Sequence, residues 1–160
     1  MNTHTISLLV ENRHGALSRV ANLFSSRGYN ISSLNVAETD DPTISRMTIV
    51  VAGDEGILEQ VVKQLNKLID VIKVLDFVLA PIIDRELVLV CVDTSKGNRT
   101  ELLELIGIYG GKVTTVGSKS ITLELMHTSE TVDEFIALVK PYGIRELVRS
   151  GKVAMARIKT

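Results

Sequence analysis

The sequence predicts an α+β protein made of two successive units, each with the order strand, helix, strand, strand, helix, strand. Three observations lead to this prediction. Apolar and polar residues alternate over short stretches, which is typical of half-buried strands. Between these stretches, apolar residues recur at helical spacing. The whole order then repeats after Pro81. The simplest interpretation is two βαββαβ arrangements, each an antiparallel sheet with two helices on one face and the other face open.

The first half, residues 1–80, shows the pattern most clearly. Ile6, Leu8 and Val10 alternate with polar residues and predict a strand that stops at Asn12. A helix is expected to open at Gly15 and to end at Gly28, and a second helix follows Gly53-Asp54. The other strands of this half are expected at residues 31–38, 45–51 and 71–79. Asp40-Asp41-Pro42 is interpreted as a turn and not as part of a metal site.

The second half, residues 81–160, starts at Pro81, which ends a strand and fixes the direction of the chain. Gly110-Gly111 is expected to stop the first helix of this half. Thr131 and Glu134 have the spacing of a capping box, so the second helix is expected to begin at Thr131. The expected helices are residues 100–109 and 131–139, and the expected strands are residues 86–92, 112–116, 121–126, 144–148 and 152–158.

Each predicted sheet leaves one face without helices. In the first half, the residues expected to need cover on that face are Leu34, Val36, Ile44 and Val50. A unit of this size cannot bury both faces of its sheet alone, so the second half or another subunit is expected to supply the cover. The pattern therefore predicts an oligomer, with a homodimer as its smallest form.

Composition excludes several classes of function. The formal net charge is −1 and only 4% of the residues are aromatic, which disfavours a nucleic-acid partner. No apolar run approaches the ~20 residues of a membrane span. The N-terminus lacks the basic and apolar regions of a signal peptide. These features lead us to expect a soluble cytoplasmic protein without a membrane or nucleic-acid partner.

No catalytic or metal-binding constellation is predicted. His4, His14 and His127 lie at no recognisable metal-ligand spacing, and His14 is interpreted as a solvated turn residue. Cys91 is the single cysteine and is expected to be a small buried residue. Arg46 alternates with apolar residues in a strand, and we expect it to reach solvent or, preferably, an acidic partner across an interface.

The most informative stretch is the junction of the first strand and the first helix. The first N–H groups of a helix have no partner inside it and carry partial positive charge, and Gly15 leaves them uncovered by a Cβ atom. They therefore suit a carboxylate. Asn12 and Asn30 flank this helix, and an amide can meet both the ammonium and the carboxylate of an amino acid. We expect the two asparagines at the same end of the sheet, or brought together from neighbouring subunits; the alternative is that each only breaks a strand.

The run from Glu11 to Leu34, ENRHGALSRV followed by LFSSRGYNISSL after two residues, resembles the regulatory (small) subunits of acetolactate synthase, also called acetohydroxyacid synthase. TDDPTISRMT at residues 39–48 and KQLNKLIDV at residues 63–71 continue the similarity, which covers nearly the whole chain. The first half resembles an ACT domain. The resemblance implies two ferredoxin-like units, an N-terminal ACT domain and an ACT-like C-terminal domain.

This resemblance implies a non-catalytic subunit that stimulates a large catalytic subunit. It further implies feedback inhibition of branched-chain amino acid biosynthesis by valine, with leucine and isoleucine as further candidates. Thiamine diphosphate, magnesium and FAD are then expected on the large subunit, with no cofactor in this chain. The family's effector-contacting positions correspond to Asn12, Gly15, Ala16, Leu17, Asn30 and Ile31.

An alternative function is a small acylphosphatase-like hydrolase on the same fold, which would use Arg13 or Arg19 with Asn30. A compact hydrolase has no need of the duplicated second half, so this alternative is less favoured. An RNA-binding module of similar topology is disfavoured by the few aromatic residues and by the absence of a basic face.

Overall fold

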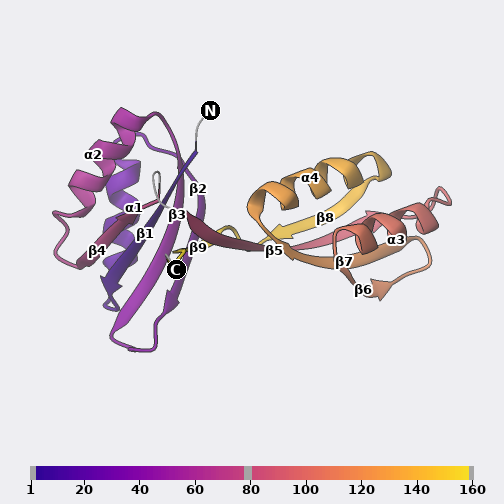
Figure 1. The fold of residues 1–160 in the computed structure, drawn as a ribbon, viewed down its shortest axis with the longest axis horizontal. Helices are drawn as coiled ribbons and strands as arrows, with labels where there is room; N and C mark the ends of the chain where they lie inside the picture. Colours follow the sequence, from indigo (N-terminus) through magenta and orange to yellow (C-terminus); the bar gives the residue numbers. More distant parts are fainter. Residues whose placement is uncertain (1–2, 78–80, 159–160) are drawn as a thin grey trace. The chain divides into compact units, whose positions relative to one another are not determined.

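The computed structural model describes residues 3–77 and 81–158, and the chain divides into two compact units (Figure 1). Unit 1 comprises residues 1–83 and 152–160, and unit 2 comprises residues 84–151. Each unit contains an antiparallel sheet with two α-helices. The predicted α+β class with two βαββαβ arrangements is confirmed.

Unit 1 has the strand order β2-β3-β1-β4. Helices α1 and α2 lie on one face of this sheet (Figure 1). The predicted last strand, residues 71–79, ends at Asp76, and residues 78–80 lie outside the described part of the chain. The elements are β1 (Thr3–Glu11), α1 (Ala16–Ser25), β2 (Ile31–Glu38), β3 (Ile44–Ala52), α2 (Glu55–Leu65) and β4 (Val71–Asp76).

The apolar side chains that alternate along β1 form part of the core of unit 1. Ile6 and Leu8 are fully buried and lie opposite Ile49 and Met47 of β3. Helix α1 adds Phe24, which is fully buried in the same cluster. Each such side chain contributes about 1.5–3 kcal/mol through its removal from water. This face of the sheet is therefore fixed beneath α1 and α2.

The register of β2 corrects one prediction. Leu34 lies opposite Ile49 and Val36 lies opposite Met47, so both face the helix-bearing side and not the open side. They are 36% and 41% exposed because β2 is an edge strand. Assigning Leu34 and Val36 to the open face was wrong: side chains alternate strictly along a strand, so a shift of one position exchanges the faces. Val50 does lie on the open face, opposite Thr5, but it is buried.

The open face of unit 1 is covered in part by the C-terminal residues of the same chain. Strand β9 (Val153–Ala156) contacts β1 and lies on the side of the sheet away from the helices (Figure 1). The Lys152 N–H donates to Ser33 Oγ at 3.0 Å, and Asn35 Nδ2 donates to the Lys152 carbonyl at 3.1 Å. Ala154 is buried. The predicted need for cover is thus met partly within the chain.

These contacts also bear on the division of the chain. The sequence placed residues 152–160 in the second unit, whereas the structure groups them with unit 1. Strand β9 pairs with β5 (Ile82–Asp93), and the Arg157 N–H donates to the Pro81 carbonyl at 2.9 Å. The hydrogen bonds of Arg157 with Pro81 and of Lys152 with Ser33 and Asn35 hold the C-terminal residues against unit 1.

Unit 2 repeats the arrangement with the strand order β6-β7-β5-β8, and α3 and α4 lie on one face of its sheet (Figure 1). Gly110 adopts φ 69° after α3, which confirms the predicted helix stop. Cys91 is half-buried, not buried as predicted, because it lies on the face without helices. The elements are β5 (Ile82–Asp93), α3 (Arg99–Ile108), β6 (Lys112–Val116), β7 (Ser120–His127), α4 (Ser129–Val139), a 3₁₀ turn (Lys140–Tyr142) and β8 (Ile144–Arg149).

Ion pairs of Arg149 with the buried Glu86 and the exposed Asp133 link β8 to β5 and α4. Arg149 donates to both carboxylate oxygens of Glu86, from Nε at 2.6 Å and from Nη2 at 2.9 Å. Its Nη1 lies 2.7 Å from Asp133 of α4. The hydrogen bond to Glu86 raises the pKa of Arg149 above its ordinary value. Glu86 is almost fully buried, and Arg149 compensates its charge there.

Helix α4 begins two residues earlier than predicted. Thr128 is its N-cap: the backbone is extended there, and Oγ1 accepts a hydrogen bond from the Thr131 N–H at 3.3 Å. Thr131 therefore lies inside the first turn, and the capping box proposed for Thr131 and Glu134 is wrong. The backbone at Thr128 is extended, which places the cap there and not at Thr131.

This cap gives a stability prediction. Thr128→Ala should lower the free energy of unfolding of unit 2 by about 1 kcal/mol, because the Thr131 N–H loses its acceptor. Thr131→Ala is the matched control. It should lower the free energy of unfolding clearly less, because the backbone N–H of residue 131 still donates to the Thr128 hydroxyl. Urea unfolding followed by circular dichroism measures both. A larger loss for Thr131→Ala would place the cap at Thr131 after all.

Candidate ligand site at the start of α1

The turn between β1 and α1 is tied to the hairpin that joins β2 and β3. Asn12 makes three hydrogen bonds: its N–H donates to the Thr43 carbonyl at 2.7 Å, and its Nδ2 donates to Glu38 Oε1 and to the Pro42 carbonyl, both at 2.9 Å. These hydrogen bonds hold the turn at the end of the sheet where β1 and β2 both finish.

Gly15 directly precedes α1 and adopts φ 81°, a left-handed conformation that favours glycine. No side chain caps the helix there. The Ala16 N–H donates to the Arg13 carbonyl at 3.2 Å, whereas the N–H groups of Leu17 and Ser18 find no acceptor among the described residues. The start of α1 thus presents free donors and the positive end of a helix dipole, which together suit a carboxylate.

An ion pair from a distant part of the chain supports this turn. Arg19 of α1 donates to both oxygens of Asp70, from Nε at 2.5 Å and from Nη2 at 3.0 Å. The same Nη2 lies 3.3 Å from the His14 carbonyl. Asp70 is 5% exposed and directly precedes β4. Arg19 therefore links the β1–α1 turn to the entry of β4, and sequence reasoning missed Asp70 because nothing local marks a partner 51 residues away.

The charge state of this pair is robust at neutral pH. The hydrogen bond from Arg19 holds the pKa of Asp70 below its usual range, and the same bond raises the pKa of Arg19. A carboxyl whose pKa is lowered by folding stabilises the folded state above its ordinary pKa, and this contribution is lost as pH falls through the lowered value. The support of the turn is therefore complete at physiological pH.

Arg19 also restricts what can replace Gly15. A Cβ atom at Gly15 would lie 2.8 Å from Arg19 Nη1, closer than real Cβ contacts allow. The positive φ would strain any such residue as well. A side chain at this position must therefore displace the guanidinium or distort the turn, in addition to covering the free N–H groups.

The other predicted effector positions have different surroundings. Ala16 is 3% exposed, so its side chain belongs to the core and only its backbone faces the turn. Leu17 is 43% exposed and provides apolar surface beside the free donors. Ile31 packs half-buried against the core of unit 1. Asn30 is exposed and directly precedes β2.

The structure separates Asn12 from Asn30 within one chain. Strands β1 and β2 both run antiparallel to β3, so they run parallel to each other. Asn12 follows the end of β1, whereas Asn30 precedes the start of β2, where Ile31 lies opposite Val51. The expectation that both asparagines lie at the same end of the sheet is therefore wrong for a single chain, because a crossover between parallel strands returns to the starting end.

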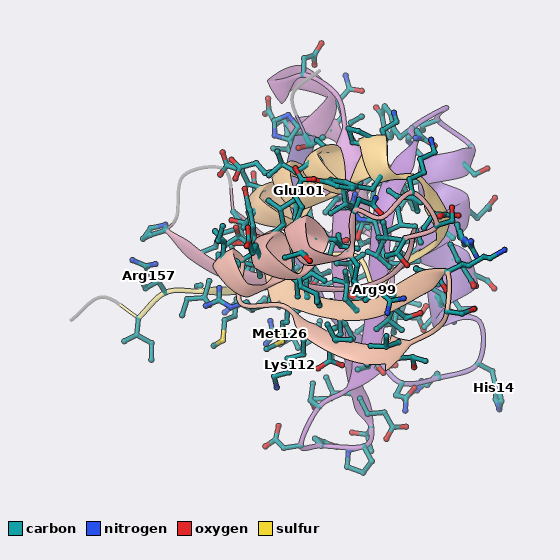
Figure 2. The ribbon with its side chains drawn as sticks, turned by 90° about the vertical axis from the view of Figure 1, so that its right-hand side faces the viewer. His14, Arg99, Glu101, Lys112, Met126 and Arg157 are labelled. Atoms are coloured by element: carbon teal, nitrogen blue, oxygen red, sulfur yellow. The ribbon has the colours of Figure 1, made fainter. Side chains whose placement is uncertain are left out.

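The groups needed by a hydrolase at this turn are already engaged. Arg13 pairs with Glu11 at 3.0 Å, and Arg19 pairs with Asp70. His14 is exposed and points away from the unit (Figure 2). Neither guanidinium stands unpaired in the turn to receive an acyl phosphate, which removes the geometric support for the acylphosphatase-like alternative.

Nearby polar residues have structural roles. Asp41 Oδ1 accepts hydrogen bonds from the Thr43 hydroxyl at 2.6 Å and from the Thr43 N–H at 2.9 Å, and the hydroxyl contact lowers the pKa of Asp41. This confirms the predicted turn. Within the part of the chain that the structure describes, no three His, Cys, Asp or Glu side chains are grouped as a metal ion requires. Among the same residues, no helix is long and apolar enough to cross a membrane.

Comparison with known proteins identifies the family. Residues 6–73 match the ACT domain of acetohydroxyacid synthase small subunits, and residues 85–158 match the small subunit of acetolactate synthase. The chain is 48% identical to the acetolactate synthase small subunit of Haemophilus influenzae, covering 95% of this chain and 94% of that protein. It is 46% identical to a probable acetolactate synthase small subunit of Methanothermobacter thermautotrophicus, covering 97% and 93%.

A solved structure agrees with these matches. The crystal structure of the acetolactate synthase small subunit from Thermotoga maritima is 35% identical, covers both chains completely and superposes with a TM-score of 0.88. Sequence and structure therefore agree over both units, and the chain belongs to the family of acetolactate synthase small subunits, with an ACT domain at its N-terminus.

Proposed function

We propose that this chain stimulates an acetolactate synthase large subunit in the cytoplasm and makes that enzyme sensitive to feedback inhibition by valine. This proposal rests on the start of α1, inside an ACT domain. There Gly15 and two free N–H groups make the N-terminus of the helix suitable for binding an anion. The chain itself supplies regulation. Thiamine diphosphate, magnesium and FAD are held by the large subunit in this proposal.

The chemistry of the turn fits an α-amino acid with an apolar side chain. The carboxylate meets the free N–H groups of Leu17 and Ser18, and the partial charge of the helix strengthens these hydrogen bonds. The exposed Leu17 side chain covers the aliphatic part of the ligand. One methylene changes binding by only ~1–3 kcal/mol. Leucine and isoleucine are therefore further effectors that the site excludes incompletely.

A second copy of the chain completes the site. Strand β2 is an edge strand, and Leu34 and Val36 on its helix-bearing side are exposed. If two β2 strands pair antiparallel about a two-fold axis, the start of one strand meets the end of the other. Asn30 of the second copy then lies beside Glu38, which accepts a hydrogen bond from Asn12. The homodimer thus brings the two asparagines together and covers the apolar edge.

Coupling to the large subunit follows from this composite site. A ligand held by both copies changes the free energy of the dimer arrangement, and the large subunit responds if it prefers one arrangement. A coupling of ~1–3 kcal/mol, typical of allosteric proteins, would change effector affinity about 5- to 150-fold between the active and inhibited enzyme.

Gly15→Asp tests the anion site. The new carboxylate repels that of valine and covers the free N–H groups, so valine should no longer inhibit the reconstituted enzyme while stimulation of the large subunit persists. Gly97→Asp is the matched control, because Gly97 also has a left-handed backbone, with φ 77°, but lies in unit 2. Initial rates with and without valine measure both. Valine inhibition of Gly15→Asp at the wild-type concentration would contradict the site.

The composite geometry has its own test. Asn12→Ala and Asn30→Ala should each abolish valine binding in a homodimer. A purified heterodimer of the two variants should bind one valine with wild-type affinity, because one of its two sites contains both wild-type asparagines. Calorimetry of doubly tagged heterodimers gives the stoichiometry. If each chain formed its site alone, every site in the heterodimer would carry a substitution and no binding would return.

A further inference from the structure

A cavity of about 450 Å³ lies on the open face of the unit 1 sheet, beside β9. This volume is within the ~300–1,000 Å³ of ordinary small-molecule sites. Its floor consists of two neighbouring cross-strand pairs of β2 and β3, and its wall belongs to β9. The residues that matter are Asn35, Ala37, Arg46, Thr48, Val153 and Ala154. The cavity lies on the opposite side of the sheet from α1, and it is therefore separate from the site at Gly15.

Arg46 is the cation of this cavity. It is half-buried, and its Nη1 donates to Ser7 Oγ at 3.0 Å, where Ser7 is fully buried. Among residues 3–77 and 81–158 no carboxylate pairs with Arg46, whereas Arg19 in the same unit has both oxygens of Asp70. An acidic partner across an interface stays a prediction, and the side-chain partner of Arg46 among the described residues is Ser7. A cation partly withdrawn from water gains from a counterion, and the fork of a guanidinium matches a carboxylate.

The surroundings of Arg46 select the kind of anion. Ala37, Val153 and Ala154 are apolar and line the same space. Glu38 and Asp40 border the cavity and lower its positive potential, which disfavours a doubly charged phosphate. A single guanidinium that shares the cavity with Ala37, Val153 and Ala154 suits a ligand with a single negative charge and a short apolar chain.

We propose that this cavity binds a short aliphatic monocarboxylate, with Arg46 as its counterion and β9 as its apolar wall. The site is additional to the valine site of the proposed function. Because the hydrogen bonds of Lys152 with Ser33 and Asn35 already hold the start of β9 against β2, the ligand strengthens the attachment of the C-terminal strand to the sheet.

Titration of the full-length ¹⁵N-labelled chain with 3-methylbutanoate tests the proposal. Saturable shifts are expected at the backbone amides of Ala37, Thr48 and Ala154. The neutral control 3-methylbutanamide has the same shape without the charge and should leave these amides unchanged. Equal shifts with the amide, the absence of saturation, or shifts confined to the Gly15 turn would each overturn the proposal.

Substitutions at the cavity sharpen the test. Arg46→Met keeps an unbranched side chain and removes the charge, so binding should weaken at least tenfold, and Arg46→Lys should restore part of it. Val153→Glu is a second variant at a half-exposed position, and it places a carboxylate beside Arg46 that should block the probe. Wild-type affinity in Arg46→Met or in Val153→Glu would overturn the assignment of Arg46.

The two sites can fail separately. Gly15→Asp should bind 3-methylbutanoate like the wild type, and Arg46→Met should bind valine like the wild type. If the probe binds and valine does not, the proposed effector site fails and this cavity stands. If valine binds and 3-methylbutanoate does not, the Arg46 cavity fails as a binding site and the proposed effector site stands.

Discussion

The parallel direction of β1 and β2 decides where the proposed effector residues of unit 1 lie. Both strands pair with β3 in the antiparallel sense, so α1 must return the chain to the end of the sheet where β1 started. This crossover fixes Asn12 and Glu38 at one end and Asn30 at the other. The proposed effector site, which uses both asparagines, therefore needs two chains, and the homodimer of the proposed function would be part of that site.

The turn at Gly15 depends on a second, long-range constraint. Asp70 lies almost buried at the entry of β4 and binds Arg19 through both carboxylate oxygens. Arg19 in turn occupies the space where a Cβ of Gly15 would lie. The free N–H groups at the start of α1 are thus kept open by glycine and kept in position by the ion pair. The local sequence explains why the N–H groups are uncovered, because it places glycine there. Only the fold explains the ion pair, because it brings Asp70 to Arg19.

The sequence was sufficient for features that depend on neighbouring residues. The alternation of Ile6, Leu8 and Val10 predicted β1 and its buried face, and the glycine after α3 predicted the helix stop. Features that depend on register or on distant contacts could not be predicted. Leu34 and Val36 were assigned to the wrong face because a strand alternates equally well in either phase until its partner is known. Which end of the sheet holds each of the two asparagines likewise could not be predicted, because it depends on the relative direction of β1 and β2.

The cover of the open face shows where a second subunit is needed. An exposed apolar face was the reason to expect an oligomer, but Ser7, Thr48 and Val50 on that face are already buried in the single chain. Residues 152–157 supply part of this cover. Part of the apolar surface that stays exposed, Leu34 and Val36, belongs to the edge strand β2 on the opposite side. The dimer of the proposed function would cover this edge, and the open face is left to the Arg46 cavity and the C-terminal strand.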